Sequence, residues 1–404
     1  MPIAVGVIKQ VIYKQETAYG TLPTSASAQL LRRTKSEVNL NKETYASNEI
    51  RTDYQIADFR HGVRSVGGAI SGELSPGTYR DFMAAVLKRD WTVLTATTGA
   101  SITIAGAGPT WTVTRAAGSW LTDGYKVGMV VRLSVGTFNA ANLNKNLLIL
   151  DITSATAMTV LPLNGVALVA EGPIATSTIT ATGRQTFVPV TGHTDRSFSI
   201  EHWFSDVPTS ERFLGCKFSK MALQLPPTGM ATVDFDVQGQ NIQTAATQYF
   251  TSPTAVTTSA PLAAVNGVLR VGGVTLATVT GLSIDISPAY SGEAVVGSNI
   301  RPALFPGMVA ITGQMTVFFD DAVLRDAFIN ETEIELLAAF TTGNEANADF
   351  ISIALPRIKI GGAAKDDVMT GIKATLPFQA LLNSAGGTGV KSERTTIQIQ
   401  DSLA

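Results

Sequence analysis

The sequence contains very little of what metal and redox sites are built from. Its 404 residues include one cysteine, Cys216, and three histidines. A single cysteine excludes an intramolecular disulfide and any cysteine-rich metal site. Cys216 lies in an apolar, strand-like run, where we expect a buried thiol. The histidines show no H-x-x-H or H-E-x-x-H spacing, so the sequence has no zinc motif. We predict neither a metal ion nor a cofactor.

Catalytic motifs are missing as well. The chain has no G-x-x-x-x-G-K-[ST] phosphate loop and no G-x-S-x-G nucleophile turn. A Ser-His-Asp triad could assemble in space from distant residues, but no motif supports one. We therefore expect that the protein is not an enzyme.

Charge and long apolar runs are also scarce. Charged residues make up 15% of the chain, and the net charge is −2. This balance argues against a general nucleic-acid or membrane-surface binder. The first residues do not form a signal peptide, and no run reaches the ~18 apolar residues of a membrane helix. We expect a soluble protein that is made in a cytoplasm and does not insert into membranes.

Strand-forming and turn-forming residues are abundant. The chain has 45% hydrophobic residues and 36 glycines, together with many Thr, Ser and Val. This composition favours a mainly β fold, and the length allows two or three domains.

An internal match suggests that one fold is used twice. Ala69–Ser75 reads A-I-S-G-E-L-S, and Ala310–Thr316 reads A-I-T-G-Q-M-T, 241 residues later (310 − 69). Upstream, Val38–Leu40 resembles Ile284–Ile286, and Tyr45 and Tyr290 follow these segments. Downstream, helix-like text follows each copy, at 79–87 and 320–328. We interpret this as an internal duplication with one flanking helix per repeat.

The first repeat has a recognisable order of elements. We predict a strand over 29–40, a second strand over 66–74 with Val66, Ile70 and Leu74 on one face, and a helix with Phe82 and its neighbours Ala85 and Val86 on one side. Between the strands, Asn41 to Phe59 is charged, and it is too long for a hairpin loop. Segments of this kind are often interaction loops.

Residues 94–190 differ from their surroundings. Charge nearly vanishes, and short strand candidates recur between glycine turns at 101–104, 110–114, 129–134, 147–152 and 157–161. This pattern predicts a small all-β sandwich or barrel. We expect Trp111 and Trp120 to anchor its core, although a ligand-stacking role stays open.

The rest of the chain supplies further strands. We predict strands over 196–204 and 230–239, and a terminal one over 395–400. In 230–239, Val233 and the alternate residues Phe235 and Val237 are apolar, while Asp234 and Asp236 share the polar face. Two carboxylates there could form a cation site, a solvated strand face or the wall of an acidic channel. The predicted domains are 1–93 plus 191–260, an inserted domain 94–190, and 261–404.

Several segments resemble one protein family. They are Lys14–Thr21, Tyr45–Arg51, Ala57–Gly62 and Ser71–Ser75. The text is similar to the tail tube (major tail) proteins of long, non-contractile-tailed bacteriophages. The resemblance covers residues 10–93 and 196–241 best, is weaker over the second repeat and does not cover the insert.

The resemblance implies a β-sandwich or split-barrel domain whose strands join across subunits around a lumen. It implies stacked rings that form a hollow tube for phage DNA. Because the domain is duplicated here, closed symmetry suggests a trimer that forms a pseudo-hexameric ring. The ring-to-ring arm would be Asn41–Phe59, with Glu49, Arg51, Asp53 and Arg60 pairing to the next ring.

The same resemblance implies further expectations. Asp234 and Asp236 become candidate lumen residues, since an acidic or neutral lining repels phosphates. The insert would project outward. Partners would be the chain itself, tape measure, terminator and tail-tip proteins, and the location would be the virion tail, assembled in the bacterial host cytoplasm. Alternatives are another phage tail part, such as a terminator, baseplate or decoration protein, a carbohydrate- or surface-binding β module, and a hydrolase.

Overall fold

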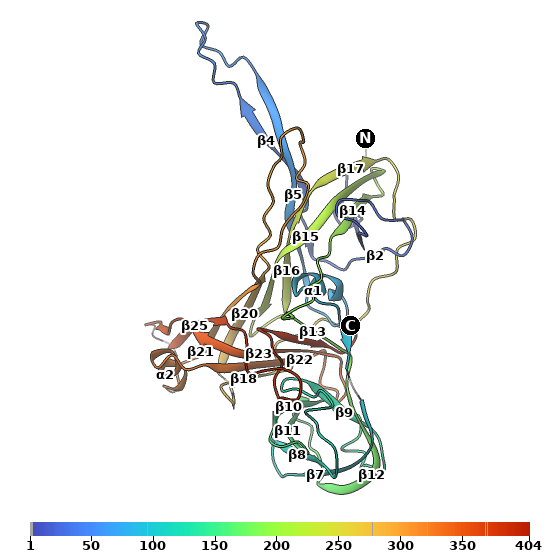
Figure 1. Cartoon of the computed structure of the whole chain (residues 1–404), viewed down its shortest axis with the longest axis vertical. Coiled ribbons are helices and arrows are strands. Elements are labelled where there is room, and N and C mark those ends of the chain that lie inside the picture. The colour runs from blue at the N-terminus through green and yellow to red at the C-terminus, as the bar shows by residue number, and fades with distance from the viewer. Residues whose placement is uncertain (1–2, 95, 277, 321, 368, 370) are drawn as a thin grey trace.

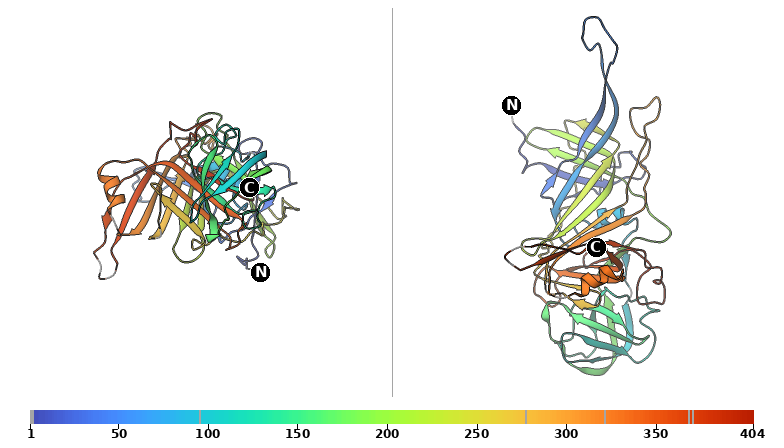
Figure 2. Two further views of the ribbon diagram at one scale, coloured as in Figure 1. Left: turned by 90° about the horizontal axis from the view of Figure 1, so that it is seen from below. Right: turned by 90° about the vertical axis from the view of Figure 1, so that its left-hand side faces the viewer.

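A computed structural model of the chain describes residues 3–94, 96–276, 278–320, 322–367, 369 and 371–404. It is an elongated, mainly β molecule with a long hairpin at one end and a small barrel at the other (Figure 1). This confirms the predicted β-rich fold class. The right-hand view of Figure 2 shows the barrel below the strands of the second unit.

The first unit surrounds helix α1 and consists of elements that lie on both sides of the barrel sequence. They are β1 (Gln10–Gln15), β2 (Gln29–Leu30), β3 (Lys35–Ser36), β4 (Asn39–Ala46), β5 (Phe59–Glu73), α1 (Arg80–Val86), β14 (Phe198–Phe204), β15 (Thr209–Leu225), β16 (Thr232–Gly239) and β17 (Asn241–Ala245).

The second unit carries helix α2 at its periphery (Figure 1), and no residue of that helix is fully buried. Its elements are β18 (Gly267–Val271), β19 (Val274–Thr275), β20 (Val279–Ser287), β21 (Ala310–Phe318), α2 (Val323–Ile329), β22 (Ile334–Thr341), β23 (Phe350–Ile360), β24 (Ala364–Lys365) and β25 (Lys373–Ala380). The short strands β6 (Thr92–Val93) and β13 (Arg184–Phe187) pair with each other, and β13 also pairs with the terminal β26 (Gln398–Asp401).

The strands between Ala96 and Ala181 form a closed barrel with its own core. They pair in the order β10-β11-β8-β7-β12-β9, where β7 is Ala96–Ala105, β8 Trp111–Arg115, β9 Val130–Val135, β10 Leu147–Ile152, β11 Ala157–Pro162 and β12 Glu171–Ala181. A short 3-10 helix, Leu163–Gly165, follows β11. Trp111 and Trp120 are both buried in this core, as predicted. The five strand candidates are confirmed; β12 was missed.

The barrel occupies the turn between α1 and β14. The chain leaves after α1 and returns so closely that the Thr194 amide donates to the Lys88 carbonyl over 2.8 Å. Val130 and Leu148 of the barrel pack on Phe350 of the second unit, and the Val130 amide donates to Gln400 Oε1 over 2.8 Å. The end of α1 and the approach to β14 therefore lie side by side, although the barrel is inserted between them.

The same antiparallel pairing order occurs in both units. In the first unit it is β1-β14-β15-β16-β5-β4. In the second unit it is β18-β22-β23-β25-β21-β20. Each helix follows the corresponding strand, α1 after β5 and α2 after β21. Even a bulge recurs at the same place, between Phe198 and Ile200 and between Ile334 and Leu336.

With that bulge as the common starting point, the cross-strand register shows which residues of the two units occupy equivalent positions. One cross-strand row of the first unit is Lys217, Gln238, Gly67, Asn39. The matching row of the second unit is Lys359, Gln379, Thr312, Asp285. Asn39 and Asp285 thus occupy equivalent positions, which agrees with the predicted match of Val38–Leu40 to Ile284–Ile286.

The seven-residue match that led the sequence argument is out of this register. Gly67 corresponds to Thr312, an offset of 245 (312 − 67), whereas the match has an offset of 241. The difference of four preserves which side of the strand each residue faces. The match therefore reflects a shared alternation of small, polar and apolar residues rather than equivalent positions.

One hydrophobic core spans both units. Phe82 of α1 packs against Phe218 in a tilted arrangement and against Phe235 edge to face. Ile284 and Ile353 of the second unit belong to the same buried cluster. Strand β15 pairs with β20, from Met221 opposite Ile286 to Leu225 opposite Leu282. This joint makes one continuous sheet from β4 through β5, β16, β15, β20 and β21 to β25.

Several predicted elements were correct and two were wrong. The helix face of Phe82, Ala85 and Val86 is buried, and so is Cys216. The strand over 29–40 is wrong, because that stretch contains β2 and β3 and only the start of β4. The prediction that Asn41–Phe59 is too long for a hairpin loop is also wrong, since β4 and β5 extend into it.

Candidate assembly surfaces

The sheet has one face directed away from the core. On β16, Val233 and its alternate neighbours are buried, whereas Asp234 is half-buried and Asp236 is exposed. Asp234 lies in a row that crosses the joint between the units. The row contains Ser71, Asp234, Ala222, Asp285, Thr312 and Gln379. The structure therefore places both aspartates on a continuous polar face that runs through both units.

This polar face carries mixed charge with an acidic excess around the joint. Asp236 lies opposite Lys220, and the Lys220 ammonium is 3.3 Å from the Asp285 carboxylate. Around the joint, the face therefore carries Lys220 together with the carboxylates of Asp234, Asp236 and Asp285, of which Asp234 lies opposite Ala222. Among the described residues, no group of three or more His, Cys, Asp or Glu is arranged to hold a metal ion.

The β4–β5 hairpin projects far beyond the rest of the molecule (Figure 1). We call residues 39–66 the arm. Its strands pair from Asn39 opposite Gly67 to Ala46 opposite Phe59, and residues 47–58 form its tip. Gly68 holds a φ of 143°, and a Cβ there would collide with the Glu37 carbonyl oxygen. A glycine is therefore needed where the arm leaves the sheet.

The predicted ring-contact charges are mostly paired within the arm. Arg51 binds Asp53 over 2.8 Å, and Arg60 binds Asp58 over 2.6 Å. Glu49 lies in the exposed tip, where its amide donates to Ser47 Oγ. Because these pairs are solvent-exposed, each contributes little to stability, and their charges are partly neutralised before any partner arrives.

Apolar side chains dominate the exposed tip, and the sequence argument missed them. Ile50 and Tyr54 are fully exposed, and Ile56 is 74% exposed. Large apolar side chains clustered on a protruding segment indicate a contact site. The signal was present in the sequence as isolated apolar residues within a charged segment.

The corresponding segment of the second unit lies beside the arm. Residues 288–309 connect β20 to β21 as the arm tip connects β4 to β5, and we call them the second loop. The Arg64 amide of β5 donates to the Asn299 carbonyl over 2.7 Å, and Arg301 lies 3.6 Å from Glu43. The second loop therefore supports the base of the arm.

A charged cluster fastens the second loop to the first unit. Asp195 accepts hydrogen bonds from Lys88 over 3.0 Å, from Tyr290 over 2.8 Å and from Lys217. Lys217 also donates to the Leu304 carbonyl over 2.9 Å. The side chains of Lys88 and Lys217 are nearly fully buried, and Asp195 is 41% exposed. We call these four side chains, Lys88, Asp195, Lys217 and Tyr290, the clamp.

Burial shapes the protonation of the clamp. It lowers the pKa of Lys88 and raises that of the Tyr290 hydroxyl. Burial also raises the pKa of Asp195, but hydrogen bonds from Lys217 and Lys88 outweigh this effect and hold it below its ordinary value. Two cations thus share one carboxylate, and the clamp carries an excess positive charge.

The continuous sheet ends in two open edges. Among the described residues, β3 and β4 pair only with β5, and β24 pairs only with β25. Inside the chain, β15 and β20 occupy the positions that β24 and β4 occupy at these open edges, and β15 and β20 pair with each other. Unpaired strand edges are templates for adding another strand.

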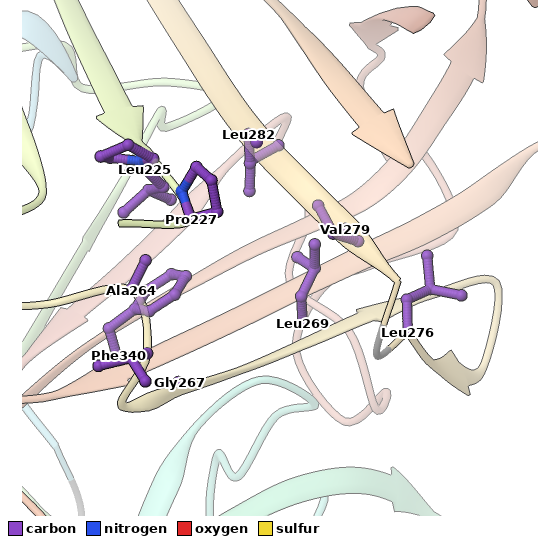
Figure 3. Close-up of a pocket in the computed structure, with 12 residues that line it drawn as sticks. Leu225, Pro227, Ala264, Gly267, Leu269, Leu276, Val279, Leu282 and Phe340 are labelled. Carbon is purple, nitrogen blue, oxygen red and sulfur yellow. The ribbon is translucent and has the colours of Figure 1, made fainter. Parts of the chain in front are cut away.

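The described residues line several cavities. Figure 3 shows one of about 230 Å³ near the joint, lined by apolar residues that include Leu225, Leu282 and Phe340. His202 is buried against Ser36, 2.8 Å away, and burial lowers its pKa to about 3. No helix within the described part of the chain is long and apolar enough to cross a membrane.

Of the comparisons with known proteins, one gives a match. A search of curated proteins finds no match. A family model described as "Phage tail tube protein" matches residues 6–380, which is nearly the whole chain. A protruding hairpin and open sheet edges fit a protein that assembles with others. The chain belongs to the phage tail tube protein family.

Proposed function

We propose that this chain is a structural, non-enzymatic subunit that closes into rings, and that stacked rings form the hollow tube through which phage DNA passes. One observation carries the proposal: a single sheet runs through two similarly paired units and ends in two open edges. The β15–β20 joint supplies a template for how those edges would pair between chains.

That template predicts the register of the joint between chains. In the second unit, Ala364 of β24 pairs with Thr375 as Ala222 of β15 pairs with Asp234. Ala222 also faces Asp285, the counterpart of Asn39. We therefore expect Ala364 of one chain to lie opposite Asn39 of the next, with Lys365 opposite Val38. Such a head-to-tail contact closes into a ring when its rotation divides a full turn.

The duplication sets the expected ring size. If one chain supplies two equivalent units, three chains give six, and we propose a trimeric, pseudo-hexameric ring. The repeated pairing order and shared bulge support the duplication. A siphophage-type tube with a non-contractile tail, as the resemblance implies, is part of the same proposal.

The polar face is the proposed lumen lining. It lies opposite the core and the helices, and Asp234 and Asp236 give it acidic character around Lys220. Carboxylates repel DNA phosphates, so DNA would pass without being held. The barrel extends from the far side of the second unit, which favours an outward position for residues 94–190.

The arm is the proposed ring-to-ring contact. Its length and its exposed tip suit a segment that reaches another subunit. Glu49, Arg51, Asp53 and Arg60 would orient it through charge, whereas Ile50, Tyr54 and Ile56 would supply the buried area. Binding to tape measure, terminator and tail-tip proteins, and assembly in the host cytoplasm into the virion tail, complete the proposal.

Negative-stain electron microscopy of the concentrated, purified chain tests this function. We expect hollow stacked tubes whose end views show threefold or pseudo-sixfold rings. A variant lacking residues 47–58 should form rings that do not stack, because the sheet edges are untouched. Single rings from the intact chain would favour a terminator or decoration role, and monomers at every concentration would contradict ring formation.

A further inference from the structure

Two tyrosines near corresponding points of the two units have different surroundings. By register, Tyr290 corresponds to Thr44, since Asp285 and Asn39 are 246 apart (285 − 39), and Tyr45 is the next residue. Tyr290 lies five residues beyond Asp285, and Tyr45 lies six beyond its register counterpart Asn39. Tyr290 is 8% exposed and belongs to the clamp, whereas Tyr45 is 53% exposed on the arm. The Tyr45 hydroxyl donates only to Glu43 in its own strand, over 2.7 Å. Tyr45 thus carries the same phenol group as Tyr290, but it is exposed on the arm and is not part of a buried cluster such as the clamp.

The residues that bind Tyr290 also have counterparts in the second unit. From the shared bulge, Phe198 corresponds to Ile334, so Asp195, three residues earlier, corresponds to Glu331. Lys217 corresponds to Lys359 through their pairing with Gln238 and Gln379. Counted from the helices, Glu331 also takes the place of Lys88, because each lies two residues past its helix with a left-handed φ, 60° at Lys88 and 52° at Glu331. Both correspondences hold because the barrel separates Lys88 from Asp195, whereas α2 leads directly to β22.

The counterpart pair is open to solvent. Lys359 lies 3.7 Å from Glu331, and their side chains are 40% and 83% exposed. The neighbouring Glu333 binds Arg357 over 2.6 Å. In the first unit, by contrast, the second loop covers the Asp195–Lys217 pair. Within the described residues the Glu331–Lys359 pair is not covered in this way, and in the proposed ring the arm of a neighbouring chain takes the place of the second loop.

We propose that Tyr45 of one chain docks against the Glu331–Lys359 pair of a second copy, as Tyr290 docks against Asp195 and Lys217. The phenol would donate to the Glu331 carboxylate, and the Lys359 ammonium would lie against the ring, as Lys217 lies 5.1 Å from the Tyr290 ring centroid. This contact rests on the proposed ring, and it fixes the base of the arm relative to the neighbouring subunit.

Site-specific photocrosslinking tests the contact in the assembled, full-length protein. A benzophenone amino acid replaces Tyr45, which is exposed, so folding should be unaffected. Irradiation should yield dimers and trimers on a denaturing gel, with crosslinks in residues 329–333 or 357–361. The matched control carries the same probe at Tyr290 and should yield a product of monomer mass, crosslinked near Lys217.

Electron microscopy of the same sample separates the possible failures. Tubes whose Tyr45 probe crosslinks elsewhere, or only within its own chain, would overturn the docking contact and leave the tube function standing. A sample without any rings would overturn the ring on which the contact rests.

Charge exchange gives a second test without the probe. Lys359→Glu places a third carboxylate beside Glu331 and Glu333, and we expect loss of tubes. Combining it with Glu331→Lys restores an opposite pair and should restore tubes. Equal tube yield from Lys359→Glu and the unaltered chain would contradict the contact.

Discussion

The clamp predicts an asymmetry between two substitutions in one charged cluster. Asp195 is the only carboxylate that faces Lys88 and Lys217 within hydrogen-bond distance in the described structure. Asp195→Asn would leave two buried ammonium groups without a counter-charge. Removing one partner of a buried pair costs about 3–5 kcal/mol. Because Asp195 is 41% exposed, we expect a smaller loss of unfolding free energy, about 2–4 kcal/mol.

Lys217→Met should be much milder, although it also removes a buried charge. It leaves Asp195 paired with Lys88 one to one and removes the excess positive charge. The lost hydrogen bond to the Leu304 carbonyl contributes only about 1 kcal/mol, and methionine retains much of the apolar stem. We expect a net change within about 1 kcal/mol, several-fold less than for Asp195→Asn.

Urea denaturation of the unassembled chain measures both effects. The transition should be followed by the circular dichroism of the β sheet, at low protein concentration and neutral pH. A double variant, Asp195→Asn with Lys217→Met, should recover part of the loss seen in Asp195→Asn, because only one unpaired cation remains. Equal losses for the two single variants would refute the charge argument and leave packing as the role of the clamp.

Three further outcomes follow from individual residues. Gly68→Ala places a Cβ against the Glu37 carbonyl at a φ of 143°, and it should lower the free energy of unfolding by about 1–3 kcal/mol in the same denaturation assay. The control Gly281→Ala has open space around the added Cβ and should leave the free energy of unfolding nearly unchanged. Burial lowers the pKa of His202 to about 3, so the unfolded chain binds a proton first when the pH drops below about 6.5, and the free energy of unfolding falls with acid. His202→Gln should remove about 3 kcal/mol of the loss of unfolding free energy between pH 7 and 4. Burial raises the pKa of Asp401 to about 6, so the folded chain binds a proton first as the pH falls, and the free energy of unfolding decreases as pH rises from about 4 to 6. Asp401→Asn should abolish this decrease. For either variant, a series of denaturation measurements over pH 4–8 that matches the parent would contradict the assignment.

Much of the fold was predictable because alternation in this sequence is strong. Val233, Phe235 and Val237 face the core, and the intervening carboxylates face away. The barrel strands were found because glycine turns separate them, and its tryptophans are buried. The strand β12 was missed because Gly172 and Pro173, near its start, are residues that are usual in turns.

The site was less predictable because its meaning depends on long-range pairing. The charged arm was recognised, but the internal pairing of Arg51 with Asp53 was not, and charge drew attention away from Tyr54 and Ile56. The clamp joins residues 88, 195, 217 and 290, which no local pattern connects. An internal duplication was predicted from seven residues and their flanks, and the cross-strand register, in which Gly67 corresponds to Thr312, could not be read from that match.

The most direct test of the proposed function is a cryo-electron microscopy reconstruction of assembled tubes without imposed sixfold symmetry. We predict three chains per ring, with β24 of each paired to the next chain so that Ala364 lies opposite Asn39. The face that carries Asp234 and Asp236 should line the lumen, and the barrel should lie outside. A ring in which those aspartates face outward, or in which β24 and β4 remain unpaired, would contradict the account.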